Sequence, residues 1–261
     1  MKILIANYLG KGTQEVSALY DALSKNHDVT IAAMASEASY LAQSFQFANE
    51  PTRVEDLGKR VYEFYSNPAD MVSIMLGQIM RHDMPDLVIC GISNGTNMGP
   101  DLYTSSNVGM AMEAAYFGVP AIVISTEFQS GTDKGAYKNI AKFVEKNIAK
   151  FAEPGLPPHT FLNIAVPRVE KYSELKGVSY TRMGRMNLQI EFIEGKDPKG
   201  GTYYWSKKST RKNLSTEGED EKRLFDMGFV VVTPINYDAT DYLAIAEWGA
   251  ITKRITRGED A

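Results

Sequence analysis

The sequence predicts an α/β protein with a Rossmann-like parallel sheet flanked by helices. Short apolar runs recur through the first 150 residues, as in strands that are buried on both faces. Segments with apolar residues at helical spacing separate these runs, and strands that alternate with helices form βαβ units. Residues that favour helix ends also stand where the helical segments begin and stop.

The strands of the first half are predicted at residues 2–6, 28–34, 86–92 and 120–126. The helices between and after them are predicted at residues 13–26, 67–80, 107–118 and 137–151. Thr13 is the expected N-cap of the first helix, Pro68 follows Asn67 in the second, and Gly118 suits the end of the third. The carboxyl ends of parallel strands share one rim, so the loops after Ala6, Ala33 and Ile92 are expected to lie together.

The second half is less regular. A turn-rich break at 154–158 precedes a strand at 161–166, and alternating residues from about 177 predict antiparallel hairpins. Residues 206–222 are highly charged and are expected to form a loop, before a strand at 229–235 and a helix over Tyr242–Trp248. We therefore expect one domain over residues 1–261. It consists of an α/β core at 1–150, a β-hairpin and loop extension at about 177–222, and a closing strand, helix and tail at 223–261.

Composition excludes several classes of function. The formal net charge is −4, which gives no electrostatic case for a nucleic-acid partner. No window approaches the roughly 18 apolar residues of a membrane-spanning helix, and Met1 leads into a strand without the features of a signal peptide. The single cysteine, Cys90, fits a reducing compartment and is interpreted as a core residue rather than a nucleophile. These observations predict a cytoplasmic protein without a membrane partner.

The loop after the third strand carries the richest chemistry, GISNGTNMGPDLYTSSNVG. Glycines let a ligand approach the backbone, and amides and hydroxyls ahead of a helix N-terminus suit a phosphate group. The alternative is a polar loop in which Asn and Gly adopt left-handed turns and Ser106 only caps the next helix.

This loop also resembles a known family. The run CGISNGTNMGPDLYTSSNVGMAMEA is similar to S-G-I-N-x-G-x-N-x-G-x-D-x-x-Y-S-G-T-V-x-x-A-x-E of the SurE (survival protein E) family. Further matches in order include MKILIANYLG, DVTIAAMASEAS, NPADMV, GVPAIVIS and GVSYTRMGR. The resemblance implies a single SurE-like domain, metal-dependent hydrolysis of nucleoside monophosphates as a 5'-nucleotidase-like phosphoric monoester hydrolase, and a homodimer or homotetramer that exchanges its hairpin and C-terminal segment.

The resemblance also implies a divalent cation, Mg²⁺ or Mn²⁺, held by two aspartates, a serine and an asparagine. These positions fall on Tyr8, Leu9, Ser39 and Ser93. Both anionic ligands are thus replaced, and only Ser39 and Ser93 remain as weak candidate metal ligands. Because cation affinity depends on ligand charge, we expect weak binding of the cation and weak or absent activity.

The part of the pattern that holds phosphate is better kept. The candidate phosphate-binding residues are Asn97, Ser105, Ser106 and Asn107. Asn7 and Asp101 are retained from the pattern and are the candidate catalytic residues. We therefore expect a pocket for a small phosphate-containing ligand.

Three interpretations of the function stay open. The chain is a SurE-like phosphohydrolase homologue of weak or no activity, an active 5'/3'-nucleotidase with rebuilt ligands, or a non-catalytic oligomeric binding protein. A rebuilt site would use Asp101, Tyr8 and the loop serines. No spacing of Ser, His and Asp supports a route through a nucleophile.

Overall fold

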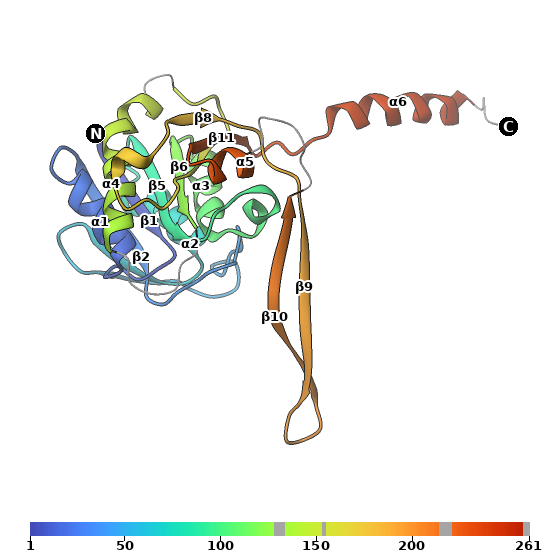
Figure 1. Ribbon diagram of the computed structural model, residues 1–261, viewed down its shortest axis with the longest axis horizontal. Helices are drawn as coiled ribbons and strands as arrows, with labels where there is room; N and C mark the ends of the chain where they lie inside the picture. Colours follow the sequence, from blue (N-terminus) through green and yellow to red (C-terminus); the bar gives the residue numbers. More distant parts are fainter. Residues whose placement is uncertain (128–133, 153–154, 214–220, 258–261) are drawn as a thin grey trace.

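The central sheet of the computed structural model has nine strands in the order β3-β4-β2-β1-β5-β6-β7-β11-β8 (Figure 1). The structure describes residues 1–127, 134–152, 155–213 and 221–257. The sheet strands are β1 (Lys2–Asn7), β2 (Asp28–Met34), β3 (Arg53–Asp56), β4 (Val61–Tyr65), β5 (Leu87–Asn94), β6 (Ala121–Thr126), β7 (Thr160–Ala165), β8 (Val178–Tyr180) and β11 (Val230–Asn236). Neighbours from β4 to β7 run parallel, which confirms the predicted α/β class.

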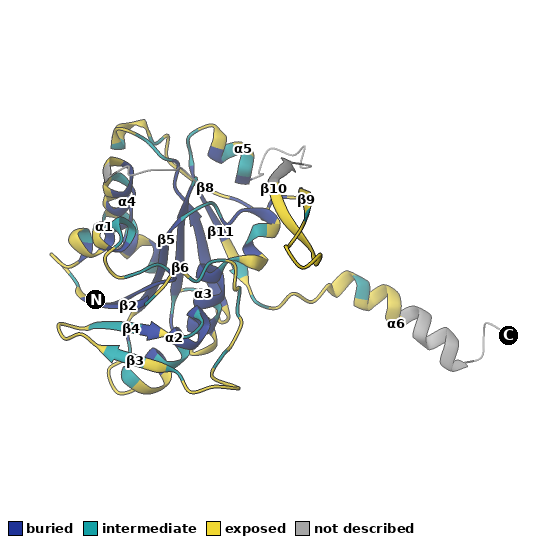
Figure 2. Ribbon diagram, turned by 90° about the horizontal axis from the view of Figure 1, so that it is seen from below, coloured by how far each residue is buried: buried dark blue, intermediate teal, exposed yellow. Residues whose placement is uncertain are grey.

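Helices cover both faces of this sheet. They are α1 (Gln14–Leu23), α2 (Pro68–Ile74), α3 (Ser106–Tyr116) and α4 (Lys134–Ala152), and a π-helix over Met75–Ile79 continues α2. Ile3 and Ile5 of β1 pack with the residues of α1 and α4, whereas Leu4 and Ala6 pack with α2 and α3. Figure 2 shows the two helix pairs on opposite sides of the sheet. The alternation of β1 residues between two cores explains why this strand reads as one continuous apolar run.

The edges of the sheet differ from the prediction. The strands β3 and β4 are not predicted, and β3 pairs antiparallel with β4. On the other side, β11 pairs antiparallel with β7 and parallel with β8, so the sheet is mixed rather than wholly parallel. The residues of β3 are exposed or half-buried, and such a strand lacks the apolar run that identifies the central strands.

The helix ends predicted from the sequence are confirmed in part. Thr13 stands at the N-cap of α1 as predicted, but its side chain makes no capping hydrogen bond. Asn67 precedes Pro68 at the start of α2, and its backbone N–H donates to the carboxylate of Asp70 at 3.2 Å. Gly118 follows α3 with a φ of +73°, a left-handed conformation that glycine adopts without steric cost.

The C-terminal extension projects from the core. Its hairpin consists of β9 (Met186–Lys196) and β10 (Thr202–Asn213), which pair with each other in a separate two-stranded sheet. The helix α6 (Tyr242–Arg257) also extends away from the sheet (Figures 1 and 2). The hairpin is predicted, but α6 continues past the expected end at Trp248. Among the described residues, no helix combines the length and the apolar character needed to cross a membrane.

The prediction of one charged loop over 206–222 is wrong at both of its ends. Residues 206–213 belong to β10, and α5 (Glu221–Asp226) begins at the other end. Residues 214–220 lie outside the described part of the chain. The strand is missed because β10 is largely exposed where its side chains are described, so its polar residues do not alternate with buried apolar ones.

Candidate functional site

A cleft of about 580 Å³ lies where β1, β2 and β5 end. The parallel register pairs Asn7 with Ala33 and Ala6 with Cys90, so the loops after these strands start at one rim, as predicted. The cleft is also lined by residues of the 3-10 helix Gly99–Thr104, of α3 and of α5. The predicted site residues that line the cleft are Tyr8, Ser39, Ser93, Asn97, Asp101, Ser105 and Ser106.

Three predicted residues do not line the cleft. Asn7 is fully buried, and its Nδ2 donates to the carbonyl of Gly91 at 2.6 Å while its Oδ1 accepts from the N–H of Leu9 at 2.8 Å. Asn7 therefore ties β1 to β5 and shapes the loop. The Leu9 side chain packs against the core formed with α2 and α3. Asn107 is fully buried in the first turn of α3, and within the described chain neither its Nδ2 nor its Oδ1 has a hydrogen-bond partner.

Tyr8 lines the cleft together with Glu37 and Ser39 of the loop after β2. Only 9% of this residue is exposed, and it belongs to the apolar cluster beneath the loop. Burial, with a smaller contribution from the Glu37 carboxylate, raises the pKa of the Tyr8 phenol to about 12, although its hydrogen bond with Ser39 acts in the opposite direction. The Ser39 hydroxyl in turn donates to the Glu37 carboxylate. Sequence reasoning missed Glu37, because its place at the cleft depends on how the loop folds back.

The loop after β2 is held against α3. The Ser106 hydroxyl donates to the carbonyl of Ala38 at 2.6 Å and accepts from the N–H of Leu41 at 3.1 Å. The buried Glu113 carboxylate accepts from Gln43 Nε2 in the same loop. These contacts fix the segment that carries Ser39.

Ser105, rather than Ser106, caps α3. Its hydroxyl accepts from the N–H of Val108 at 3.3 Å, whereas the alternative interpretation of the sequence assigned this role to Ser106. Both serines line the cleft at the N-terminus of an 11-residue helix. The N-terminal end of such a helix carries a partial positive charge and favours an anion.

The loop after β5 uses its polar groups internally. The Ser93 hydroxyl donates to the carbonyl of Gly95 at 3.1 Å and lies 3.5 Å from Asn97 Nδ2. Asn163 of β7 donates through its Nδ2 to the carbonyl of Asn97 at 2.9 Å. Ser93 and Asn97 are both buried, so their side chains help to pack this loop, while Asn94 and Thr96 of the same loop are half-buried and also line the cleft.

A buried carboxylate of α5 supports the same region. Glu221 Oε1 accepts from the N–H of Gly99 and, at 2.8 Å, from the N–H of Gly184, and its Oε2 accepts from the Thr233 hydroxyl at 3.1 Å. The residue is 1% exposed. Sequence reasoning placed Glu221 in a solvated charged loop, so its structural role was missed.

The charged groups of the cleft come from separate segments. The carboxylates of Glu37, Asp101, Glu127 and Asp226 line it together with the ammonium group of Lys222. Lys222 forms an ion pair with Asp226. In the part of the chain that the structure describes, no group of three or more His, Cys, Asp or Glu residues could hold a metal ion. At the positions where the resemblance implies two aspartates, Tyr8 and Leu9 supply no carboxylate, so the implied set of ligands lacks both of its anionic members and does not fit Mg²⁺ or Mn²⁺.

Two other possible reactive groups lie elsewhere. Cys90 is buried in β5, and burial raises the pKa of its thiol, so it is a core residue as predicted. The three histidines, His27, His82 and His159, are not among the residues that line the cleft.

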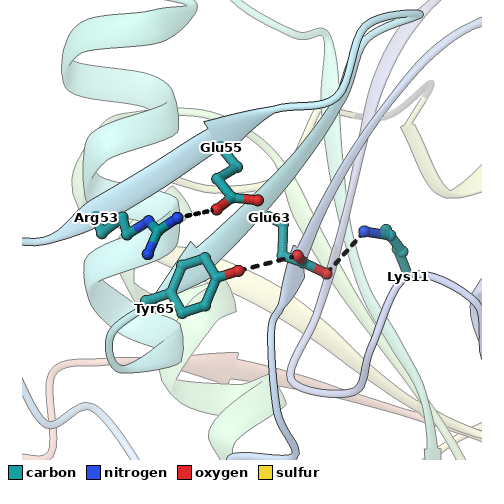
Figure 3. A network of polar contacts seen from close by, with 5 residues as sticks. All are labelled: Lys11, Arg53, Glu55, Glu63 and Tyr65. Atoms are coloured by element: carbon teal, nitrogen blue, oxygen red, sulfur yellow. Dashed lines mark hydrogen bonds and ion pairs between the residues drawn. The ribbon is translucent and has the colours of Figure 1, made fainter.

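An ion-pair network at the edge of the sheet holds the loop after β1 from outside (Figure 3). Lys11 Nζ lies 3.0 Å from the Glu63 carboxylate on β4, and the Tyr65 hydroxyl donates to the same carboxylate at 3.4 Å. Arg53 of β3 pairs with Glu55 and lies 4.8 Å from the centre of the Tyr65 ring. The loop that carries Tyr8 is thereby fastened to the edge strands.

Comparisons with known proteins agree with this fold. Residues 3–189 match the sequence model of a family described as Survival protein SurE. The 5'-nucleotidase SurE of Syntrophobacter fumaroxidans is 32% identical over 253 residues, which cover 95% of this chain and 98% of the relative. The 5'-nucleotidase SurE of Pseudoalteromonas atlantica is 30% identical over 247 residues, which cover 95% and 97%. The crystal structure of the SurE protein from Aquifex aeolicus superposes with a TM-score of 0.81 at 28% identity, covering 97% of this chain and 100% of that one.

Proposed function

The chain belongs to the SurE family, and on this basis we propose that it binds a nucleoside monophosphate in the cleft but hydrolyses it weakly or not at all. The names of the relatives support a nucleotide as the ligand class. The observation that carries the second half of the proposal is the buried Tyr8 ring beside Leu9, at the positions where the family resemblance implies two aspartates.

The reaction of the family depends on a metal ion, which supplies positive charge to the phosphate and activates water. The remaining candidate ligands here are Ser39 and Ser93, and both hydroxyls already donate within the protein. Two neutral hydroxyls cannot replace two carboxylates, because affinity for Mg²⁺ or Mn²⁺ rests on ligand charge. We therefore assign no catalytic step to a metal ion, and we expect the rate to be lower by several powers of ten.

Binding of the phosphate group is supported by the N-terminus of α3. Ser105 and Ser106 line the cleft there, and Asn97 lies on the facing loop. Asp101 also lines the cleft and is the candidate base that remains accessible to a ligand. Asn7 is buried and hydrogen-bonded to the backbone, which supports a positioning role for this residue.

Glu37 favours the alternative of an active enzyme with rebuilt ligands. Its carboxylate lies beside Ser39 at the cleft and supplies a negative charge that the family pattern does not predict at this place. A cation held by Glu37 and Ser39 would have one anionic ligand, compared with the two aspartates that the family resemblance implies.

Exposed apolar side chains support assembly into a homodimer or homotetramer. They lie on the hairpin and on α6, and each is more than half exposed: Phe192, Ile193, Tyr204, Trp205, Tyr242, Leu243, Ile245 and Trp248. Large exposed apolar groups of this kind ordinarily become covered in an interface. Such an assembly would serve an enzyme and a non-catalytic binding protein equally. A cytoplasmic location is part of the proposal, supported by the use of a single buried cysteine.

The test is release of phosphate from AMP, GMP, CMP and UMP with added Mn²⁺ or Mg²⁺, or with EDTA. The native chain is compared with the double variant Tyr8→Asp, Leu9→Asp and with the uncharged control Tyr8→Asn, Leu9→Asn. We expect near-background rates from the native chain and from the Asn control, and metal-dependent turnover from the Asp variant. Circular dichroism of each variant verifies that the fold is retained.

Metal-dependent turnover by the native chain would contradict the proposal. If that turnover disappeared in Glu37→Gln, the alternative of an active enzyme with rebuilt ligands would replace the proposal.

A further inference from the structure

Tyr40 stands at the mouth of the cleft in an unusual backbone conformation. Its φ is +58°, a left-handed value that residues with a Cβ seldom adopt, and 78% of the residue is exposed. The residue lines the cleft directly after Ser39. An exposed ring gains little from packing, so burial does not explain why a tyrosine occupies a position that suits glycine.

The backbone of the loop that carries Tyr40 is held against α3. On one side of Tyr40, the carbonyl of Ala38 accepts from Ser106, and on the other side the N–H of Leu41 donates to the same hydroxyl. Just beyond, Ala42 lies so close to α3 that a Cβ at Gly109 would be 2.1 Å from its carbonyl oxygen. The backbone on both sides of Tyr40 is therefore fixed to the helix whose N-terminus meets the cleft.

The other residues that line the cleft suggest that the Tyr40 ring contacts a ligand. The buried Tyr8 also lines the cleft, and the phenol groups of Tyr8 and Tyr40 are near enough to influence each other electrostatically. Ser105 and Ser106 line the cleft as well. A cleft of about 580 Å³ has the size typical of small-molecule sites, so one ligand can meet the ring and the serines together.

We propose that Tyr40 is the base-contacting residue of this cleft and that its ring stacks on the nucleobase of a bound nucleotide, whose phosphate lies at the N-terminus of α3. This inference rests on the proposed function and deepens it, because it makes the base, and not only the phosphate, part of what is recognised. Stacking uses the face that every base possesses, so purine and pyrimidine nucleotides are both expected to bind. The backbone on both sides of Tyr40 is already held, so little backbone freedom is lost when the ligand binds.

The experiment measures binding of three probes by calorimetry in EDTA: AMP, ribose 5-phosphate and inorganic phosphate. We expect Tyr40→Ala to weaken AMP binding about tenfold and to change the affinity for ribose 5-phosphate less than twofold, since only AMP has a base to stack. Tyr40→Phe keeps the aromatic face and should bind AMP like the native chain. The matched control is Tyr103→Ala, which removes another exposed tyrosine ring that does not line the cleft.

A second variant separates the loss of the ring from damage to the loop. Tyr40→Gly removes the ring and also the Cβ that makes the left-handed backbone unfavourable, so it should unfold at a higher temperature than Tyr40→Ala. Both variants should nevertheless weaken AMP binding equally. A restored affinity in Tyr40→Gly would overturn the proposal, because backbone conformation alone would then govern binding.

The remaining outcomes distinguish this inference from the proposed function. If the native chain binds ribose 5-phosphate as tightly as AMP, or if Tyr40→Ala weakens both equally, the stacking role is wrong while the phosphate pocket stands. If the native chain binds none of the three probes, the proposed function fails and the inference fails with it. A change in the mass of the Tyr40→Ala assembly by light scattering, with AMP binding unaltered, would assign the ring to a subunit interface instead.

Discussion

Replacing Tyr8 by phenylalanine should change how stability depends on pH. The phenol of Tyr8 is buried, and its pKa is raised to about 12 in the folded chain, against about 10 for a tyrosine in an unfolded chain. Below pH 10 both states keep the proton, so the group does not alter the free energy of unfolding. Between pH 10 and pH 12 the unfolded chain loses the proton while the folded chain retains it, so stability falls as the pH rises.

The size of the effect follows from the two pKa values. The pKa of Tyr8 differs by about two between the folded and unfolded chains, and a pKa difference of one corresponds to about 1.4 kcal/mol. The chain therefore loses roughly 2–3 kcal/mol of stability by pH 12. About 1.3 kcal/mol of this loss appears between pH 9 and pH 11, where denaturation is easier to measure. Tyr8→Phe lacks the titrating group and should not show this part of the loss.

The assay is urea denaturation of both proteins at pH 9, 10 and 11, followed by circular dichroism. The chain has 14 tyrosines, and because the other 13 are common to both proteins, their titration cancels in the difference. The native chain should lose about 1.3 kcal/mol more than Tyr8→Phe over this range. A difference between the two proteins that stays constant with pH would refute the burial of the phenol.

Two further variants test how the loop after β2 is held. Gly109→Ala should destabilise the chain by about 1–3 kcal/mol in urea denaturation, because the new Cβ would meet the carbonyl oxygen of Ala42. Helix propensity alone predicts the opposite, so a more stable variant would contradict the close contact. Glu113→Gln should cost about 1–3 kcal/mol in the same assay. The two carboxylate oxygens of Glu113 accept from Gln43 and Ser73, and in the variant an NH₂ group, which can only donate, replaces one of these oxygens. Unchanged stability would show that these hydrogen bonds do not hold the loop.

The central strands could be predicted because their burial produces a local pattern in the sequence. In β1, β2 and β6 nearly every residue is buried, and each strand therefore appears in the sequence as an apolar run. The edge strand β3 and its neighbour β4 could not be identified in this way, since their residues are mostly exposed or half-buried. The antiparallel pairing of β11 with β7 depends on tertiary packing and has no signal in the sequence of either strand.

The candidate site could likewise be predicted only in part from the sequence. The order of the strands places the loops with Tyr8, Ser39 and Ser93 at one rim, and this follows from the parallel topology alone. The position of Glu37 follows from no local pattern, since its part in the cleft depends on the turn of the loop after β2. The buried Glu221 was taken for a solvated residue because its partners Gly99, Gly184 and Thr233 lie 12 to 122 positions away in the sequence.

The most direct test of the central claim is titration of the native chain with Mn²⁺, with free and bound ion distinguished by electron paramagnetic resonance. Because Tyr8 and Leu9 supply no carboxylate and Ser39 and Ser93 supply only neutral hydroxyls, we expect no bound Mn²⁺ at micromolar concentrations of the ion. The variant Tyr8→Asp, Leu9→Asp should bind the ion under the same conditions. Stoichiometric binding of one Mn²⁺ per native chain with micromolar affinity, lost in Glu37→Gln or Ser39→Ala, would contradict the claim that this cleft has lost its cation site.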